Sequence, residues 1–218
     1  MSLEVKQLEN ELMKSNCFIV TDWATHSCVI IDPGSEKSER EIEYIESNQL
    51  RLDYIILTHE HTDHTWGANA LKERYPLSKL VCSELCDKYA KKDSRAYFLF
   101  YYDDPNYRYE LKPADVVVKS DEDVLLWNKY NMGFIQTPGH SRGSMCIKIE
   151  NMLFTGDTIM PFKPFFNGRG SNEDYWVESV IKIKNIISPD VIIYPGHGES
   201  LSFAEWLNID EYHLLYNK

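Results

Sequence analysis

Three histidines and two acidic residues lie within six positions of the chain, between His59 and His64. This segment reads His-Glu-His-Thr-Asp-His, although the 218 residues include only seven histidines. Imidazole nitrogens and carboxylate oxygens are the ligands that bind zinc, iron and manganese in proteins. So dense a group of ligands predicts a metal-binding segment, in preference to a polar loop that holds its histidines by accident.

The apolar run Tyr54–Leu57 directly precedes this segment and is typical of a buried strand. If the extended conformation continues beyond the strand, side chains alternate between its two sides. That alternation places His59, His61 and Asp63 on one side. His64 then faces elsewhere unless the chain turns there.

Three further candidate ligands each follow a glycine at the end of an apolar run, namely His140, Asp157 and His197. A glycine lets the backbone turn sharply and lets an ion approach closely. His26 and His213 lack this context, and we interpret them as ordinary surface or core residues.

The number of candidate ligands predicts how many ions they bind. Five imidazoles and two carboxylates exceed the four ligands of one tetrahedral ion. They suit two ions about 3.5–4 Å apart with a bridging carboxylate. The alternative is a single ion, in which case one or two of these residues contact the ligands and do not bind the metal themselves. The candidate metal ligands are His59, His61, Asp63, His64, His140, Asp157 and His197.

The elements around these residues indicate one layered α/β domain over residues 1–218, because strand-like and helix-like segments occur in both halves without a linker-like stretch. Residues 3–12 fit either a strand or a short helix. The expected strands are 17–20, 28–31, 54–57, 80–82, 116–118, 124–126, 134–136, 145–149, 152–154 and 191–194. The expected helices are 35–48, 65–75, 84–92, one from about Ser171 to Ile187, and 202–207.

Composition limits the partners and the compartment. The formal charge of −11 repels nucleic acid and anionic membrane surfaces, so we expect a small-molecule substrate instead. The five cysteines form no CxxC pair, which favours buried, reduced thiols. The N-terminus has no secretory pattern and no apolar run is long enough for a membrane span, so the expected location is the cytoplasm.

Aromatic residues are concentrated in segment 89–109. One interpretation is that these residues pack a helix and a loop onto the core. The other is that they form the wall or lid of a pocket, or a homodimer contact, since exposed aromatic residues favour recognition. The sequence leaves these interpretations open.

Four motifs together resemble the metallo-β-lactamase superfamily, closest to its glyoxalase II-like (hydroxyacylglutathione hydrolase-like) branch without the C-terminal helical domain. The motifs occur in the family's order, and together with Asp32 they extend the resemblance from Asp32 to His197, which is nearly the whole chain. The motifs are Thr58-His59-Glu60-His61-Thr62-Asp63-His64, Pro138-Gly139-His140-Ser141-Arg142-Gly143-Ser144, Phe154-Thr155-Gly156-Asp157-Thr158 and Pro195-Gly196-His197-Gly198.

This resemblance implies the four-layer αβ/βα sandwich of the metallo-β-lactamase fold. It also implies two divalent ions, with zinc favoured and iron or manganese as alternatives. The implied ligands of the first ion are His59, His61 and His140, and those of the second are Asp63, His64 and His197, with Asp157 bridging both. Asp32 resembles the family's buried acid, from which we expect a hydrogen bond to one of the ligands.

Two cations lower the pKa of a shared water towards neutrality and polarise a substrate carbonyl. We therefore predict a hydrolase in which metal-bound hydroxide cleaves an ester-type bond, and the resemblance favours a thioester. Asp63 and Asp157 are the predicted catalytic residues, and Asp63 is also a candidate for moving a proton. The alternatives are a mononuclear iron enzyme similar to persulfide dioxygenases, and a lactonase or phosphodiesterase of the same superfamily.

Overall fold

The computed structural model describes residues 3–11, 13–90, 109–166, 168 and 170–209. The chain divides into two compact units, Met1–Val117 and Val118–Lys218. Each unit is built around a mixed six-stranded sheet with flanking helices, which confirms the predicted α/β class. The expectation of one domain over residues 1–218 stays a prediction.

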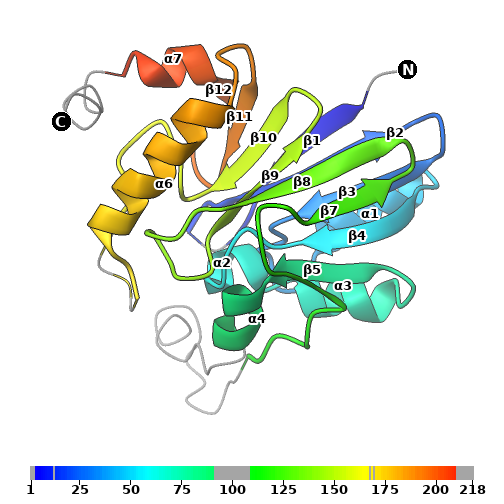
Figure 1. The fold of residues 1–218 in the computed structure, drawn as a ribbon. Helices are drawn as coiled ribbons and strands as arrows, with labels where there is room; N and C mark the ends of the chain where they lie inside the picture. The colour runs from blue at the N-terminus through cyan, green and yellow to red at the C-terminus, as the bar shows by residue number, and fades with distance from the viewer. Residues whose placement is uncertain (1–2, 12, 91–108, 167, 169, 210–218) are drawn as a thin grey trace. The chain divides into compact units, whose positions relative to one another are not determined.

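In the sheet of the first unit the first two strand pairs are antiparallel and the next two are parallel. Its strands are β1 (Glu4–Glu9), β2 (Asn16–Asp22), β3 (Ser27–Ile31), β4 (Arg51–Ile56), β5 (Lys79–Ser83) and β6 (Val116–Val118), in that spatial order (Figure 1). Strand β1 resolves the open choice for residues 3–12. Because β3 runs parallel to β4, and β4 to β5, the carboxyl ends of these three strands lie at one edge.

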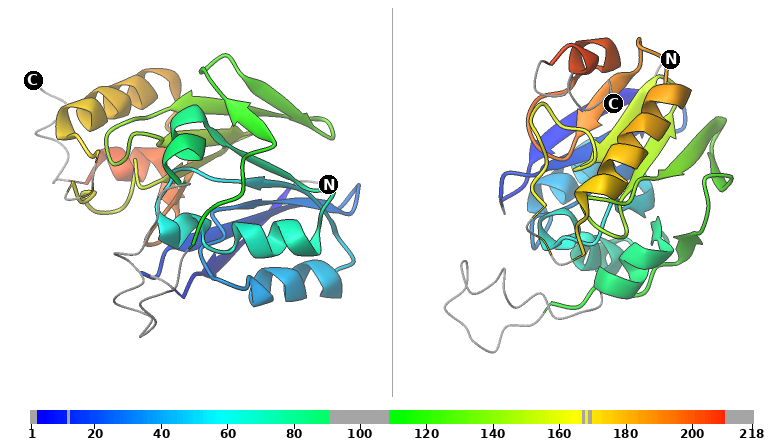
Figure 2. Two further views of the ribbon diagram at one scale, coloured as in Figure 1. Left: turned by 90° about the horizontal axis from the view of Figure 1, so that it is seen from below. Right: turned by 60° about the vertical axis from the view of Figure 1, so that its left-hand side comes forward.

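The helices in the described part of the first unit are α1 (Glu39–Ser47), α2 (Thr62–Thr65), α3 (Ala68–Arg74) and α4 (Glu84–Ala90). Helices α1 and α3 lie side by side on one face of the sheet (Figure 2). Ile45 of α1, Leu71 of α3 and Cys86 of α4 are buried in the same cluster as Ile30 and Ile55 of the strands. Burial of this apolar surface is the main favourable term that holds the helices on the sheet.

The helix expected over 65–75 is confirmed by α3 for residues 68–74, but the separate helix α2 precedes it, and the chain is not helical at Trp66 and Gly67. The N–H of Gly67 donates to the carbonyl oxygen of Pro33 at 2.7 Å. A Cβ atom at Gly67 would lie 2.3 Å from the carbonyl oxygen of Ser35. Close backbone contact with the loop after β3 therefore interrupts the helix.

The sheet of the second unit has the spatial order β12-β11-β10-β9-β8-β7, and only its β10–β11 pair is parallel. Its strands are β7 (Val124–Trp127), β8 (Tyr130–Gln136), β9 (Met145–Ile149), β10 (Met152–Gly156), β11 (Ile192–Pro195) and β12 (Leu201–Ser202). Its helices are α6 (Glu173–Ile186) and α7 (Phe203–Leu207), and Figure 1 shows α6 lying along the sheet with α7 beside β12.

Trp176 anchors α6 in the core of the second unit, where its side chain is buried with Phe203 and Trp206 of α7. The indole N–H of Trp176 donates to the carbonyl oxygen of Thr158 at 2.7 Å, so its polar atom is satisfied despite burial. The side chain of Asn172 caps α6 by accepting from the main-chain N–H of Tyr175. The cap is thus one residue later than the start expected at Ser171.

All five cysteines are free and buried, as the sequence predicted. Burial raises the pKa of the Cys28 and Cys146 thiols to about 12, because the apolar interior disfavours the thiolate. We expect the native protein at pH 8 to react with a thiol reagent at least about 100-fold more slowly than the unfolded chain, since the thiolate is the nucleophile. A colorimetric thiol assay with and without denaturant measures this ratio, and rapid labelling of the native protein would contradict it.

Within the described part of the chain, no helix has both the length and the apolar character that crossing a membrane requires. Most of the aromatic segment 89–109, with its predicted pocket or dimer role, lies outside the described residues. Its last member, Tyr109, is buried and donates its hydroxyl to the carbonyl oxygen of Thr65 at 2.5 Å. For Tyr109 the packing interpretation therefore holds.

Candidate metal-binding clusters

The first cluster of candidate ligands lies where β3 and β4 end. Ile31 pairs with Ile56 in parallel register, so the residues that follow both strands meet at one edge of the sheet. Asp32 follows β3 with a left-handed φ of 56°, and its N–H donates to the carbonyl oxygen of Ile56 at 3.0 Å. This turn directs the chain so that the Asp32 carboxylate reaches the segment after β4.

The Asp32 carboxylate accepts three hydrogen bonds from that segment. Thr58 donates its main-chain N–H to Oδ1 at 2.7 Å and its hydroxyl to Oδ2 at 2.6 Å. Nδ1 of His64 lies 3.0 Å from Oδ2. The hydrogen bond expected between Asp32 and a candidate ligand is therefore present, and it reaches His64.

These contacts fix the hydrogen atom on two imidazole rings. A carboxylate only accepts, so the hydrogen of His64 is on Nδ1. The Thr58 hydroxyl gives its single hydrogen to Asp32, and it therefore accepts from Nδ1 of His59, 2.9 Å away. In the neutral rings of His59 and His64, Nε2 then carries the lone pair that can bind a metal.

The chain turns into α2 at Thr62, which corrects the expected extended alternation through this segment. His61 is the N-cap of α2, with φ −68° and ψ 144°. Because the turn is helical, His64 comes back towards His59, and their ring centroids are 4.2 Å apart. Nε2 of His59 also lies 3.1 Å from Nδ1 of His61. The three histidines thus converge through a turn, where the strand pattern had separated His64 from the other two.

Asp63 completes the first cluster. Its side chain is nearly buried, with a relative exposure of 7%, and Oδ2 lies 3.5 Å from Nε2 of His64. Since Nδ1 of His64 carries the hydrogen, a neutral ring presents a lone pair to this carboxylate oxygen. Two acceptors face each other, and a cation between them would satisfy both.

The second cluster lies where β10 and β11 end in the second unit. These strands are parallel, and Gly156 pairs with Pro195, so the following residues Asp157 and His197 emerge at the same edge. The N–H of Gly196 donates to the carbonyl oxygen of Gly156 at 2.8 Å and ties the two loops together. Nε2 of His197 lies 3.6 Å from Oδ2 of Asp157.

His140 reaches the same carboxylate from the loop after β8, with Nε2 at 3.2 Å from Oδ2 of Asp157. Its Nδ1 lies 3.1 Å from the carbonyl oxygen of Phe165, which can only accept, so Nδ1 carries the hydrogen. Nε2 of the neutral ring therefore again presents a lone pair to a carboxylate oxygen. This set of imidazole nitrogens and carboxylate oxygens fits a divalent metal ion.

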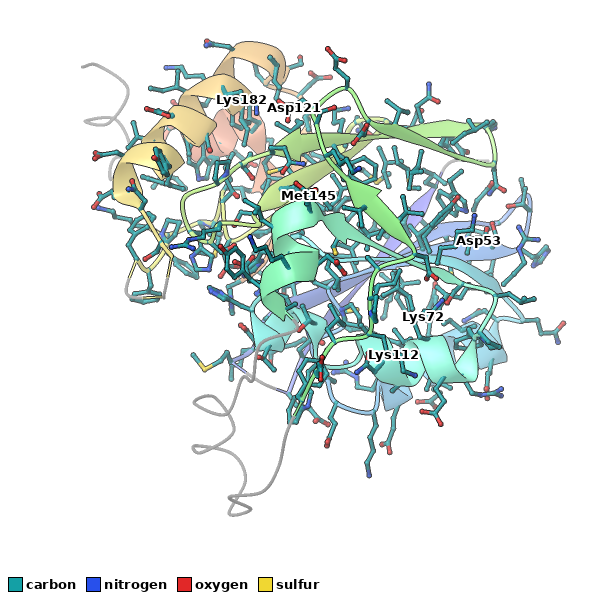
Figure 3. The ribbon with its side chains drawn as sticks, turned by 60° about the horizontal axis from the view of Figure 1, so that its bottom comes forward. Asp53, Lys72, Lys112, Asp121, Met145 and Lys182 are labelled. Atoms are coloured by element: carbon teal, nitrogen blue, oxygen red, sulfur yellow. The ribbon has the colours of Figure 1, made fainter. Side chains whose placement is uncertain are left out.

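The loop that carries His140 is fixed to α6. Gly139 has φ 148°, and a Cβ atom there would lie 2.4 Å from the main chain of Trp176, so only glycine fits without strain. Two side chains hold Gln136 at the start of the loop. Lys182 donates to the carbonyl oxygen of Gln136 at 2.7 Å, and the main-chain N–H of Gln136 donates to the carboxylate of Asp121 at 2.6 Å. Lys182 and Asp121 also pair with each other at 2.5 Å and lie side by side (Figure 3).

The structure thus brings the seven predicted ligands together as two clusters, one in each unit. The first comprises His59, His61, Asp63 and His64, and the second comprises His140, Asp157 and His197. No role was predicted for Thr58 from the sequence, although its position directly before His59 was a signal that its hydroxyl could orient the neighbouring ring. That the residues of both clusters form a single two-metal centre stays a prediction.

Comparison with known proteins gives one family match and several similar proteins. The family model described as "Metallo-beta-lactamase superfamily" matches residues 11–197. A probable polyketide biosynthesis zinc-dependent hydrolase, BaeB of Bacillus velezensis, is 27% identical over 198 residues, covering 89% of this chain and 79% of that protein. Hydroxyacylglutathione hydrolase 1 of Vibrio vulnificus is 27% identical over 213 residues, covering 95% of this chain and 72% of that protein.

The crystal structure of BLEG-1 B3 metallo-beta-lactamase is similar to this chain with a TM-score of 0.83 and 22% identity. The similarity covers 94% of this chain and 97% of that chain. At this identity the likeness concerns the fold alone. The two mixed six-stranded sheets with flanking helices are those of the metallo-β-lactamase fold, which confirms the predicted fold class.

Proposed function

Because the chain belongs to the metallo-β-lactamase superfamily and is a metal-dependent hydrolase of that superfamily, we propose that it hydrolyses a thioester at a two-metal centre. The observation that carries this proposal is the donor set of the two clusters. Lone pairs of imidazole nitrogens face carboxylate oxygens at 3.2 Å for His140 and Asp157 and at 3.5 Å for His64 and Asp63. Such pairs are suited to share a cation.

In the proposed centre the seven residues divide between two divalent ions, of which zinc is the first choice. The zinc-dependent relative BaeB supports that choice. The ligand count also supports two ions, because five imidazoles and two carboxylates exceed one tetrahedral shell. His59, His61 and His140 would hold the first ion, Asp63, His64 and His197 would hold the second, and Asp157 would be a ligand shared by both.

The bound ions would lower the pKa of a water molecule towards neutrality and polarise the carbonyl that the water attacks. The chain's own groups have to orient the ligands and move a proton. Asp32 orients His64 directly, and through Thr58 it also orients His59. Asp63, the nearly buried acid of the cluster, is the candidate for accepting the proton as the ester-type bond is cleaved.

The thioester proposal rests on the similarity to hydroxyacylglutathione hydrolase. A small-molecule substrate also agrees with the charge of −11, which repels nucleic acid. Five free cysteines support a reducing compartment such as the cytoplasm. These properties favour a soluble thioester as the substrate class.

Metal analysis combined with a substrate panel tests the proposal. We expect about two equivalents of zinc per chain, and a kcat/KM for acyl thioesters at least about 100-fold above that for lactones and phosphodiesters, because specificity is the ratio of these constants. Activity should disappear after removal of the metal with a chelator and return when zinc is added. One bound iron with oxygen uptake would instead support a persulfide dioxygenase-like enzyme, and a preference for lactones or phosphodiesters would contradict the thioester class.

A further inference from the structure

The main-chain carbonyl of Asp63 lies near the end of helix α2, which is a single turn. In a continuous α-helix the N–H of Gly67 would donate to this oxygen. Here the N–H of Gly67 donates to Pro33 instead, at 2.7 Å, because α2 ends after one turn. A carbonyl at a helix end needs a partner from elsewhere when it is buried.

The partners come from the turn between β1 and β2, about fifty positions earlier in the chain. Ser15 donates its hydroxyl to the carbonyl oxygen of Asp63 at 2.5 Å, and Nδ2 of Asn10 approaches the same oxygen at 3.5 Å. Ser15 is completely buried and Asn10 is 3% exposed. These contacts are therefore part of the interior, where an unsatisfied carbonyl is costly.

The hydrogen atoms of this network have one consistent arrangement. Asn10 donates from Nδ2 to the hydroxyl oxygen of Ser15 at 2.9 Å, which leaves the Ser15 hydrogen for Asp63. The hydroxyl of Ser35 donates to Oδ1 of Asn10 at 3.3 Å and so sets the orientation of the amide. The N–H of Asn10 closes the turn by donating to the carbonyl oxygen of Ser15 at 2.7 Å.

The same turn also holds the segment that carries Asp32. Nδ2 of Asn10 donates to the main-chain carbonyl oxygen of Asp32 at 3.1 Å. Gly34 packs directly on the carbonyl of Asp63, since a Cβ atom there would lie 1.6 Å from that oxygen. Asn10 and Ser15 thus join the backbone that carries the orienting carboxylate to the backbone of α2.

We propose that Ser15 and Asn10 are positioning residues for the metal ligands Asp63 and His64. They act through the main chain of α2, which is a single turn, so a shift of its Asp63 carbonyl would move both side chains. A displacement of about 1 Å is enough to impair a metal or catalytic site. The inference rests on the proposed metal centre, because it assigns these residues a role in the affinity of that centre.

The test is zinc affinity in Ser15→Ala, measured by competition with a chromogenic chelator. We expect the affinity to fall about 10-fold or more, as is typical when a group that orients metal ligands is lost. The visible absorption spectrum of the cobalt-substituted protein should change with it. If Ser15→Ala does not fold, Ser15→Cys retains a similar volume with a weaker donor and should show a smaller loss of the same kind.

Ser78→Ala is the matched control. Ser78 is also buried and also donates to a main-chain carbonyl, that of Tyr75 at 2.7 Å, but it lies at the turn before β5. This variant should lose comparable stability and keep the wild-type zinc affinity and cobalt spectrum. If the Ser15 variants bind zinc as tightly as Ser78→Ala, the positioning role is wrong. Failure of the proposed centre would look different, because the wild-type protein itself would then bind no stoichiometric zinc.

Discussion

Asp63→Ala is expected to abolish hydrolysis and to lower the bound metal. The substitution removes a carboxylate that faces Nε2 of His64 at 3.5 Å, and with it the candidate proton acceptor. We expect kcat/KM to fall on the order of 1000-fold or more, because one group is lost both as a ligand and as a base. Elemental analysis of the purified variant and steady-state kinetics with the best thioester measure both effects. His61→Ala should behave in the same way.

Asp53→Ala is the matched control for this experiment. Asp53 is an aspartate of β4 in the same unit (Figure 3), and it pairs with Arg51 at 2.6 Å. Arg51 is largely exposed, so the pair contributes about 1 kcal/mol or less. The control should therefore keep its metal and its activity. Full hydrolysis by an Asp63→Ala protein verified to be metal-free would overturn the mechanism.

Gly34→Ala is expected to destabilise the protein severely. A Cβ atom at this position would lie 1.6 Å from the carbonyl oxygen of Asp63 and 2.6 Å from its carbon. Both atoms belong to the main chain, so a side-chain rotation cannot relieve the clash and the backbone has to move. We expect the free energy of unfolding to fall by about 3 kcal/mol or more, at the upper end of the range for overpacking. Denaturant titration measures the change.

Gly133→Ala is the corresponding control, since a Cβ atom at Gly133 would meet nothing within 4 Å. Gly133 lies in β8, where alanine should be neutral or slightly stabilising because it restricts the unfolded chain. A Gly34→Ala variant as stable as Gly133→Ala would show that the loop after β3 and α2 separate without cost. The tight contact would then have no importance for the site.

The strands were predictable from the sequence because their apolar runs are short, rich in β-branched residues and bounded by turn residues. Residues 28–31 match β3, and 145–149 match β9. The candidate ligands were predictable for a similar reason, since each follows such a run. Strand ends and glycines locate residues along the chain without any knowledge of tertiary contacts.

The path of the chain around the ligands was not predictable from periodicity. The interruption at Gly67 depends on contacts with Pro33 and Ser35, more than thirty positions earlier. The return of His64 towards His59 likewise depends on where α2 begins. Tertiary contacts decide both features, and a local pattern does not contain them.

The polar residues that support the ligands were the hardest to find. Ser15 and Asn10 lie in a turn, where polar residues are expected in any protein. Their partner Asp63 is 48 positions from Ser15 and 53 from Asn10. A buried hydroxyl in a turn has the same sequence signature as an exposed one, so only the fold distinguishes them.

The hydrogen bonds at Nδ1 of His59, His64 and His140 determine when these rings lose their rotational freedom. Each Nδ1 is held by an oxygen of the same unit, from Thr58, Asp32 and Phe165 respectively. The conformational entropy of the rings is therefore lost during folding, before any ion arrives. Uptake of metal by these rings resembles binding to a rigid, preorganised chelator, in which little ordering of side chains opposes the affinity.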